Sequence, residues 1–105
     1  MENELDFTKI DGFEWNEGNV NKNWVRHLTS CEEAEEIFVN LPKILLVDKK
    51  HSTVEERFII LGRTDKNRRL IVSFTIRNNK FRIISARDMN KKERRKYEEK
   101  IKKYT

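Results

Sequence analysis

The strongest constraint on the fold is a run of alternating residues in the second half of the chain. In residues 69–77, apolar side chains occupy every second position, which places them on one face of a β-strand. Asn78 and Asn79 follow, and asparagine tolerates the positive φ angles of a two-residue hairpin turn. Residues 81–87 then return as the next strand. The pattern predicts an antiparallel β-hairpin.

Shorter apolar segments predict the rest of the sheet. Residues 44–47 are a short apolar run, and residues 55–61 form a second candidate strand that Gly62 ends. Residues 13–15 favour one more short strand, because two aromatic residues alternate around Glu14. With the hairpin, these segments predict an antiparallel sheet of three to four strands.

Two helices are predicted before the sheet. Asn16 is a good N-cap for a helix that runs to about His27, and Val20, Trp24 and His27 share one face at helical spacing. The helix contains a glycine and several asparagines, so packing against the rest of the protein must stabilise it.

Ser30 and Glu33 form a capping box for the second helix, which Pro42 ends. Its apolar stripe consists of Ala34, Ile37, Phe38 and Leu41.

A last helix is predicted after the hairpin. Asn90 and Glu93 form its cap, and the helix runs to about Lys103. Its stripe is narrow and only partly apolar, so we expect the helix to dock lightly. The stripe consists of Met89, Glu93, Tyr97, Ile101 and Tyr104. These elements predict one α+β domain over residues 1–105.

The charge is distributed unevenly along the chain. Residues 1–62 contain 7 Lys or Arg and 13 Asp or Glu, which gives a net charge of −6. Residues 63–105 contain 16 Lys or Arg and 5 Asp or Glu, which gives a net charge of +11. A basic half favours contact with a polyanion, and nucleic acid is the commonest one inside cells. A solvated charged surface is the alternative.

The sequence predicts a cytoplasmic protein. Cys31 is the single cysteine, so no intramolecular disulfide forms. The N-terminus is acidic and lacks the apolar core of an export signal, and no apolar run is long enough to span a membrane.

Four segments resemble the BrnT family of RelE-like toxins in order and spacing. They cover about residues 12–99 and read FEWNEGNVNKNWVRH, SCEEAEEIF, HSTVEERFIILG and FRIISARDMNKKERRKYEE. The chain departs from the family pattern at one place, where Arg26-His27-Leu28 stands for the usual Lys-His-Gly.

This resemblance implies a RelE-like fold and a metal-independent endoribonuclease that inhibits translation and growth. It also implies a BrnA-like ribbon-helix-helix antitoxin, with two toxins and two antitoxins in the complex. Operator DNA is then contacted only through the antitoxin. The alternative is a catalytically inactive toxin-fold module that binds antitoxin or nucleic acid.

Metal-free RNA cleavage needs a base for the ribose 2′-OH, cations for the phosphorane and an acid for the leaving oxygen. Arginine suits the second task, and the candidates are Arg57, Arg82 and Arg87, all predicted on strands or their ends. Their alternative role is structural pairing with the glutamates of the first half. These glutamates include Glu32, Glu33 and Glu36.

Strand alternation predicts which candidates share a face. Glu55 and Arg57 lie on one face, about 6.6–6.8 Å apart along their predicted strand. Ser85 and Arg87 also share a face, whereas Arg82 lies on the other in a flat strand. A bulge, twist or strand end changes this parity, and the sequence does not decide it.

Two histidines are candidate proton carriers near neutral pH. His51 precedes the EERF segment, where it can approach Glu55, or it is simply an exposed loop residue. His27 ends the first helix, where it acts catalytically or caps the helix beside Trp24. No cofactor or metal site is predicted, since neither metal-ligand spacing nor a glycine-rich phosphate loop is present.

The last helix begins with a basic run, from which we predict RNA contact through Lys91, Lys92, Arg94 and Arg95. The same run suits an acidic antitoxin segment, or it is a solvated helix face.

Overall fold

The computed structural model describes residues 6–103 of the 105 residues. Two short 3-10 turns, Phe7–Lys9 (η1) and Lys49–His51 (η2), accompany the regular elements. The regular elements are β1 (Phe13–Glu14), α1 (Glu17–His27), α2 (Cys31–Val39), β2 (Ile44–Val47), β3 (Phe58–Arg63), β4 (Arg69–Arg77), β5 (Lys80–Asp88) and α3 (Lys91–Lys102). Within this part of the chain, no helix is long and apolar enough to cross a membrane.

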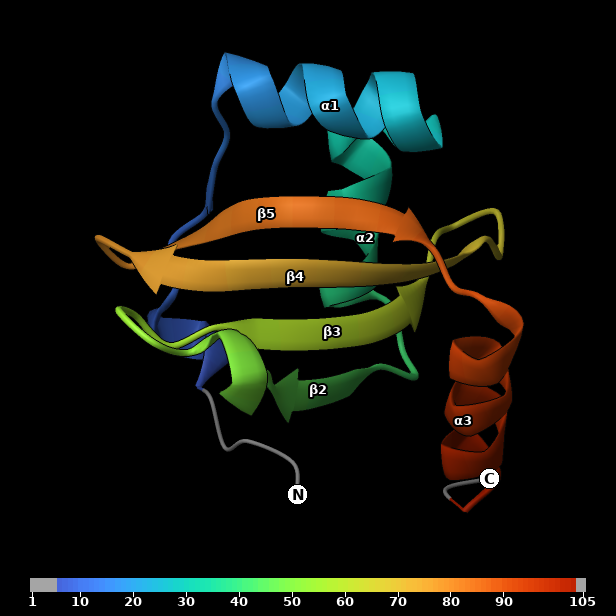
Figure 1. Ribbon diagram of the computed structural model, residues 1–105. Coiled ribbons are helices and arrows are strands. Elements are labelled where there is room, and N and C mark those ends of the chain that lie inside the picture. Colours follow the sequence, from blue (N-terminus) through green and yellow to red (C-terminus); the bar gives the residue numbers. More distant parts are fainter. Residues whose placement is uncertain (1–5, 104–105) are drawn as a thin grey trace.

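The strands form one mixed sheet with the order β1-β5-β4-β3-β2 (Figure 1). Strands β2 to β5 are antiparallel neighbours, as predicted. The sheet has five strands rather than three or four, because β1 adds to β5 in parallel, with Phe13 beside Phe81 and Glu14 beside Arg82. A two-residue strand carries no sequence pattern that names its partner, so this pairing was not predicted. The α+β class is confirmed.

The predicted hairpin is present, and its turn has the expected geometry. Asn78 and Asn79 have φ angles of 54° and 61°. One irregularity follows on β5: Phe74 pairs with Ile83, whereas Ser73 pairs with Ser85. Ile84 is therefore an extra residue, and this bulge inverts the alternation of β5 beyond it.

Helix α2 covers one face of the sheet and forms the main core there (Figure 1). Phe38 packs against Phe81 and Phe74 with ring centroids 4.6 and 5.1 Å away. Gly62 does not end β3 but lies inside it. A glycine fits there because a Cβ at this position would approach Ile37 to 3.1 Å. The capping box of Ser30 and Glu33 is confirmed.

The predicted stripe of α2 is too long by one residue. The helix ends at Val39, before Pro42, and Leu41 lies beyond it with 71% of its surface exposed. Pro42 disfavours the helical conformation at the residue that precedes it, which places Leu41 outside the helix.

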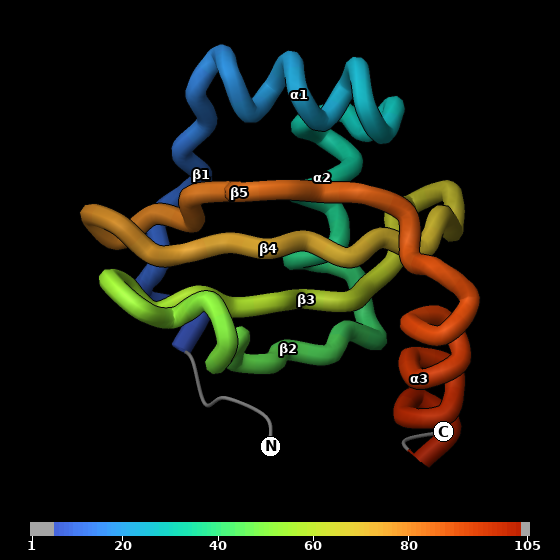
Figure 2. The backbone as a smooth tube through the Cα atoms, viewed as in Figure 1, coloured from blue at the N-terminus to red at the C-terminus, as the bar shows by residue number. Residues whose placement is uncertain are grey.

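Helix α1 is capped by Asn16 and ends at His27 as predicted, but it packs through a different face. Asn23, rather than Val20 and Trp24, is its buried residue. The helix lies along β5 (Figure 2). The edge of β5 there offers unpaired main-chain groups that asparagine can bind.

Helix α3 has the predicted cap and packs on the sheet face opposite α2. Its packing is confined to a small second cluster around the buried Tyr97, with Met89 and Ile101 at its edge. The Tyr97 hydroxyl donates a hydrogen bond to the Pro42 carbonyl at 2.6 Å, which fixes this side chain as structural. Tyr104, also predicted on this stripe, lies outside the described residues.

Candidate active site

The sheet face on which α3 packs, called the α3 face here, combines polar and basic side chains. Strand β4 directs Ser73, Thr75 and Arg77 to this face, because its alternate residues Leu70, Val72 and Phe74 enter the main core. Helix α3 covers only the aliphatic end of this face, around Ile71. The polar part of this face extends towards the β4–β5 turn. We call this polar part the hairpin end of the α3 face.

The bulge at Ile84 decides which residues of β5 join this face. Arg82 is opposite Thr75, Ser85 is opposite Ser73, and Arg87 is opposite Ile71. Directly opposed residues lie on the same side of a sheet. Of the alternatives that the sequence left open, the bulge is the one present, so Arg82 and Arg87 do not point to opposite sides as they would on a flat strand. The two arginines share the α3 face, roughly 13–16 Å apart along the strand.

Glu55 and Arg57 do not lie on a strand, since β3 begins at Phe58. Predicting their shared strand face was therefore wrong. Arg57 is nonetheless held at the strand entrance: its N–H donates to Ser52 Oγ at 2.9 Å, and its carbonyl accepts from the Asp48 N–H at 2.8 Å. The polar groups of the β2–β3 connection replace strand pairing here.

The same connection lies against the hairpin end. Thr75 Oγ1 donates to the Glu56 carbonyl at 2.8 Å, which ties the residue before Arg57 to the centre of β4. Arg82 is the neighbour of Thr75 on the other side. Arg57 and Arg82 are therefore brought to the same end of the sheet, from opposite sides of β4.

Neither of these two guanidinium groups has a hydrogen-bond or ion-pair partner within residues 6–103. Among the described residues, neither pairs with a glutamate of the first half, which is their predicted alternative role. Glu33 binds Arg68 instead, and Glu36 accepts the Asp65 N–H. Arg57 and Arg82 are thus cations that can still bind a phosphate.

Two further pairs surround them. Arg77 binds Glu55 at 2.8 Å, and both side chains are well exposed. His51 Nδ1 lies 2.9 Å from Asp48 Oδ2, so the partner of His51 is Asp48 and not Glu55. The Asp48 side chain is only 16% exposed, against 56% for His51. A mostly buried carboxylate thus orients a half-exposed imidazole through Nδ1.

Arg87 is at the other end of the α3 face and is already occupied. Its guanidinium binds both carboxylate oxygens of Glu93, at 2.8 and 2.9 Å. This hydrogen bonding raises the pKa of Arg87 and lowers that of Glu93, against the opposing effect of burial. The pair joins β5 to the cap of α3.

His27 is not part of the hairpin end. It ends α1 near Asp88, at the far end of β5. The Arg68 hydrogen bond is the main cause that lowers the pKa of Asp88, and the charge of His27 contributes less. The six predicted catalytic residues therefore divide in two: four at the hairpin end, and Arg87 and His27 at the opposite end.

Sequence reasoning missed Arg68, which binds more groups than any predicted arginine. It bridges Glu33 and Asp88 and donates to the His27 and Leu28 carbonyls and to Thr29 Oγ1. Arg68 lies in a polar turn, with no periodicity to single it out. Asp48 was missed for the same reason.

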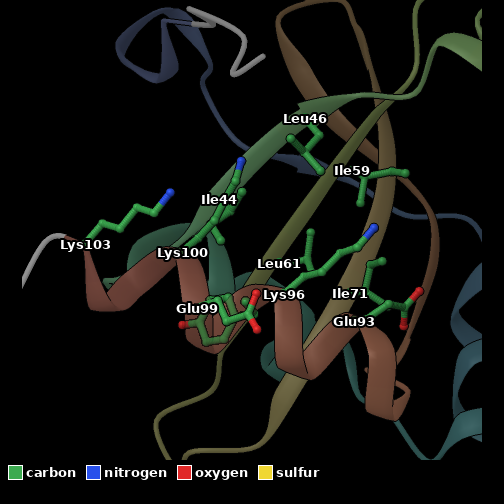
Figure 3. Close-up of a pocket in the computed structure, with 11 residues that line it drawn as sticks. Ile44, Leu46, Ile59, Leu61, Ile71, Glu93, Lys96, Glu99, Lys100 and Lys103 are labelled. Atoms are coloured by element: carbon green, nitrogen blue, oxygen red, sulfur yellow. The ribbon is translucent and has the colours of Figure 1, made fainter.

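A cavity of about 530 Å³ lies between α3 and the sheet (Figure 3). Its floor is aliphatic, and Lys96, Lys100 and Lys103 of α3 line its rim. The predicted RNA-contacting residues, Lys91, Lys92, Arg94 and Arg95, are all exposed on the same helix. In residues 6–103, no three His, Cys, Asp or Glu side chains gather into a group that could hold a metal ion.

The family model described as "Ribonuclease toxin, BrnT, of type II toxin-antitoxin system" matches residues 15–93. The match begins beside β1 and ends in the first turn of α3, so it spans both ends of the α3 face. No curated protein sequence matches the chain significantly.

Proposed function

The chain belongs to the BrnT family of type II ribonuclease toxins, and we propose that it is a metal-independent endoribonuclease whose active site is the hairpin end of the α3 face. One observation carries the proposal: Arg82 on β5 and Arg57 at the entrance of β3 lie on either side of Thr75, and neither guanidinium has a partner within residues 6–103. Cations held by a fixed backbone stabilise developing charge without reorganisation.

In this proposal, Arg57 and Arg82 bind the non-bridging oxygens of the scissile phosphate. Each guanidinium donates from a planar fork that matches two phosphate oxygens. The negative charge on these oxygens grows in the pentacoordinate transition state, so the interaction is stronger there than with the substrate. Arg87 holds α3 through Glu93, and a phosphate would have to displace that carboxylate to bind it.

We assign the base to His51. Its Nε2 takes the proton of the ribose 2′-OH, the 2′-oxygen bonds to phosphorus, and the bond from phosphorus to the 5′-oxygen breaks. Solvent supplies a proton to the leaving 5′-oxygen, and a 2′,3′-cyclic phosphate remains. Asp48 orients the ring and stabilises the imidazolium as it forms, because the hydrogen bond to Nδ1 is already made.

The remaining assignments follow from the family and the charge. A type II toxin has an antitoxin partner, and we propose a BrnA-like ribbon-helix-helix protein in a complex of two toxins and two antitoxins, acting in the cytoplasm. The four exposed cations at the start of α3 guide RNA onto the α3 face. Glu55 forms an ion pair with Arg77, so in this proposal Arg57 and Arg82, and not Arg77, bind the phosphate.

Arg82→Ala tests the site. We expect kcat for a single-stranded RNA to fall by roughly 100-fold or more, because one preorganised cation is lost from the transition state. Arg82→Lys should recover only part of the rate, since lysine offers a point charge. Lys22→Ala removes one exposed positive charge from α1 and serves as the matched control. An Arg82→Ala protein that is folded and cleaves within threefold of the wild type would refute the assignment.

A further inference from the structure

Helix α1 presents its polar side to the protein and its apolar side to solvent. Asn19 Nδ2 donates to the Ile83 carbonyl at 2.7 Å, and Asn23 Oδ1 accepts from the Ala86 N–H at 3.2 Å. Both bonds satisfy the outer edge of β5 where β1 no longer covers it. The need to pair this edge explains why asparagines face inwards. Because the asparagines face inwards, the apolar stripe of the helix faces solvent.

The outward side of α1 carries several exposed apolar side chains, with the polar Glu17 and Asn21 among them. Val20, Trp24 and Leu28 recur at intervals of four residues, and Val25 adjoins them; together they form the α1 patch. Their exposed fractions are 39% for Val20, 54% for Trp24, 64% for Leu28 and 68% for Val25. A groove of about 430 Å³ runs between Trp15 and Trp24 at its edge. A helix stripe this exposed is typical of an interaction site.

The backbone conformation of Leu28 is a second indication that this surface binds another molecule. It follows α1 in the left-handed conformation, with φ 49° and ψ 40°. Glycine is the favoured residue there, and a side chain with a Cβ is disfavoured. Burial of the Leu28 side chain within the protein does little to offset this disfavoured conformation, since the side chain is mostly exposed. Contact with another molecule would explain why it occupies this position.

The charges around the patch indicate what covers it. The groove is lined by Asn16, Glu17 and Asn21 besides its apolar residues, and by no cation. Lys22 and Arg26 do not line this groove; by helical periodicity they lie on the far side of Val25 from it. An RNA backbone needs cations, so the patch favours a protein with apolar side chains and a basic residue near Glu17.

We propose that the α1 patch is a docking surface for the antitoxin, which places an amphipathic helix there. Apolar residues of that helix cover Trp24 and Leu28, and a lysine or arginine pairs with Glu17. The inference rests on the type II pairing of the proposed function and not on the catalytic assignments. An antitoxin that stays bound keeps the patch covered. The docking surface lies along the β5 edge, outside the hairpin end of the α3 face (Figure 1).

Binding between the purified chain and its type II antitoxin tests the proposal, with isothermal titration as the readout. Trp24→Ala should weaken the Kd by roughly tenfold or more, because tryptophan anchors dominate interfaces. Val39→Ser is the matched control: Val39 is an aliphatic residue of α2, 75% exposed, and its loss should leave the Kd unchanged.

Leu28→Gly separates binding from folding. Glycine accepts the left-handed conformation, so the thermal midpoint should not fall, whereas the Kd should weaken several-fold. All variants should cleave RNA at the wild-type rate, which keeps a failed active-site proposal distinguishable from a failed docking proposal.

An unchanged antitoxin Kd in folded Trp24→Ala would overturn the inference. So would a dimer of the isolated chain in sedimentation that Trp24→Ala dissociates, since the patch would then bind a second copy. A loss of RNA affinity without a loss of antitoxin affinity would equally overturn it.

Discussion

The Arg68 guanidinium joins parts of the chain that are far apart in sequence. It binds Glu33 of α2, Asp88 at the end of β5, and the carbonyls of His27 and Leu28. Its side chain is only 24% exposed, so most of its hydration has been replaced by these partners. A guanidinium offers five donors in a fixed plane, which lysine cannot reproduce.

Replacing Arg68 should therefore cost more stability than replacing a surface arginine. For Arg68→Ala we expect the free energy of unfolding in urea to fall by about 2–4 kcal/mol, the loss for a broken buried pair discounted for partial exposure. Arg77→Ala breaks the exposed Glu55 pair and should cost about 0–1 kcal/mol. Equal losses in the two variants would show that Arg68 does not link the elements in this way.

At the scale of elements, local rules predicted what local interactions determine. The caps of α1, α2 and α3 are present because each side chain bonds a main-chain N–H within its own first turn. The Asn78–Asn79 turn is present because its φ angles depend on those two residues alone. The core stripe of β4 follows from strand alternation, with Leu70, Val72 and Phe74 buried.

The features that the sequence did not predict depend on distant partners. The bulge at Ile84 exists only relative to β4, and it alone moves Arg82 to the face of Arg87. Hydrogen bonds to the free edge of β5 determine which side of α1 faces inwards, although the apolar stripe through Trp24 predicted the other side. Residue type identified arginine and histidine as candidates, but the tertiary structure decided which of them share an end of the sheet.

At the scale of the whole molecule, charge separates the surfaces. The basic second half supplies β4, β5 and α3, so the cations gather around the α3 face. The first half supplies α1 and α2; the acidic residues are concentrated on α2, whereas α1 carries Glu17 together with Lys22 and Arg26. In the arrangement that we propose, RNA binds at the α3 face and the antitoxin helix at the α1 patch.

Neutralising the start of α3 tests this arrangement. Replacing Lys91, Lys92, Arg94 and Arg95 by glutamine should weaken RNA binding and make it less dependent on salt, by about 0.7 in the logarithmic slope for each lost phosphate contact. Lys22→Gln with Arg26→Gln removes exposed cations from α1 and should leave the slope unchanged. A slope unaffected by the α3 changes would place the RNA elsewhere.

We propose that this protein cleaves RNA through the 2′-OH with its own side chains. The most direct measurement uses the purified, antitoxin-free chain and a labelled RNA in excess EDTA, beside the same RNA with one 2′-deoxy residue at the cleaved position. We expect cleavage of the first substrate in EDTA, with a 2′,3′-cyclic phosphate on the product, and no cleavage at the deoxy position. Cleavage that stops in EDTA and returns with Mg²⁺, or that proceeds at the deoxy residue, would contradict it.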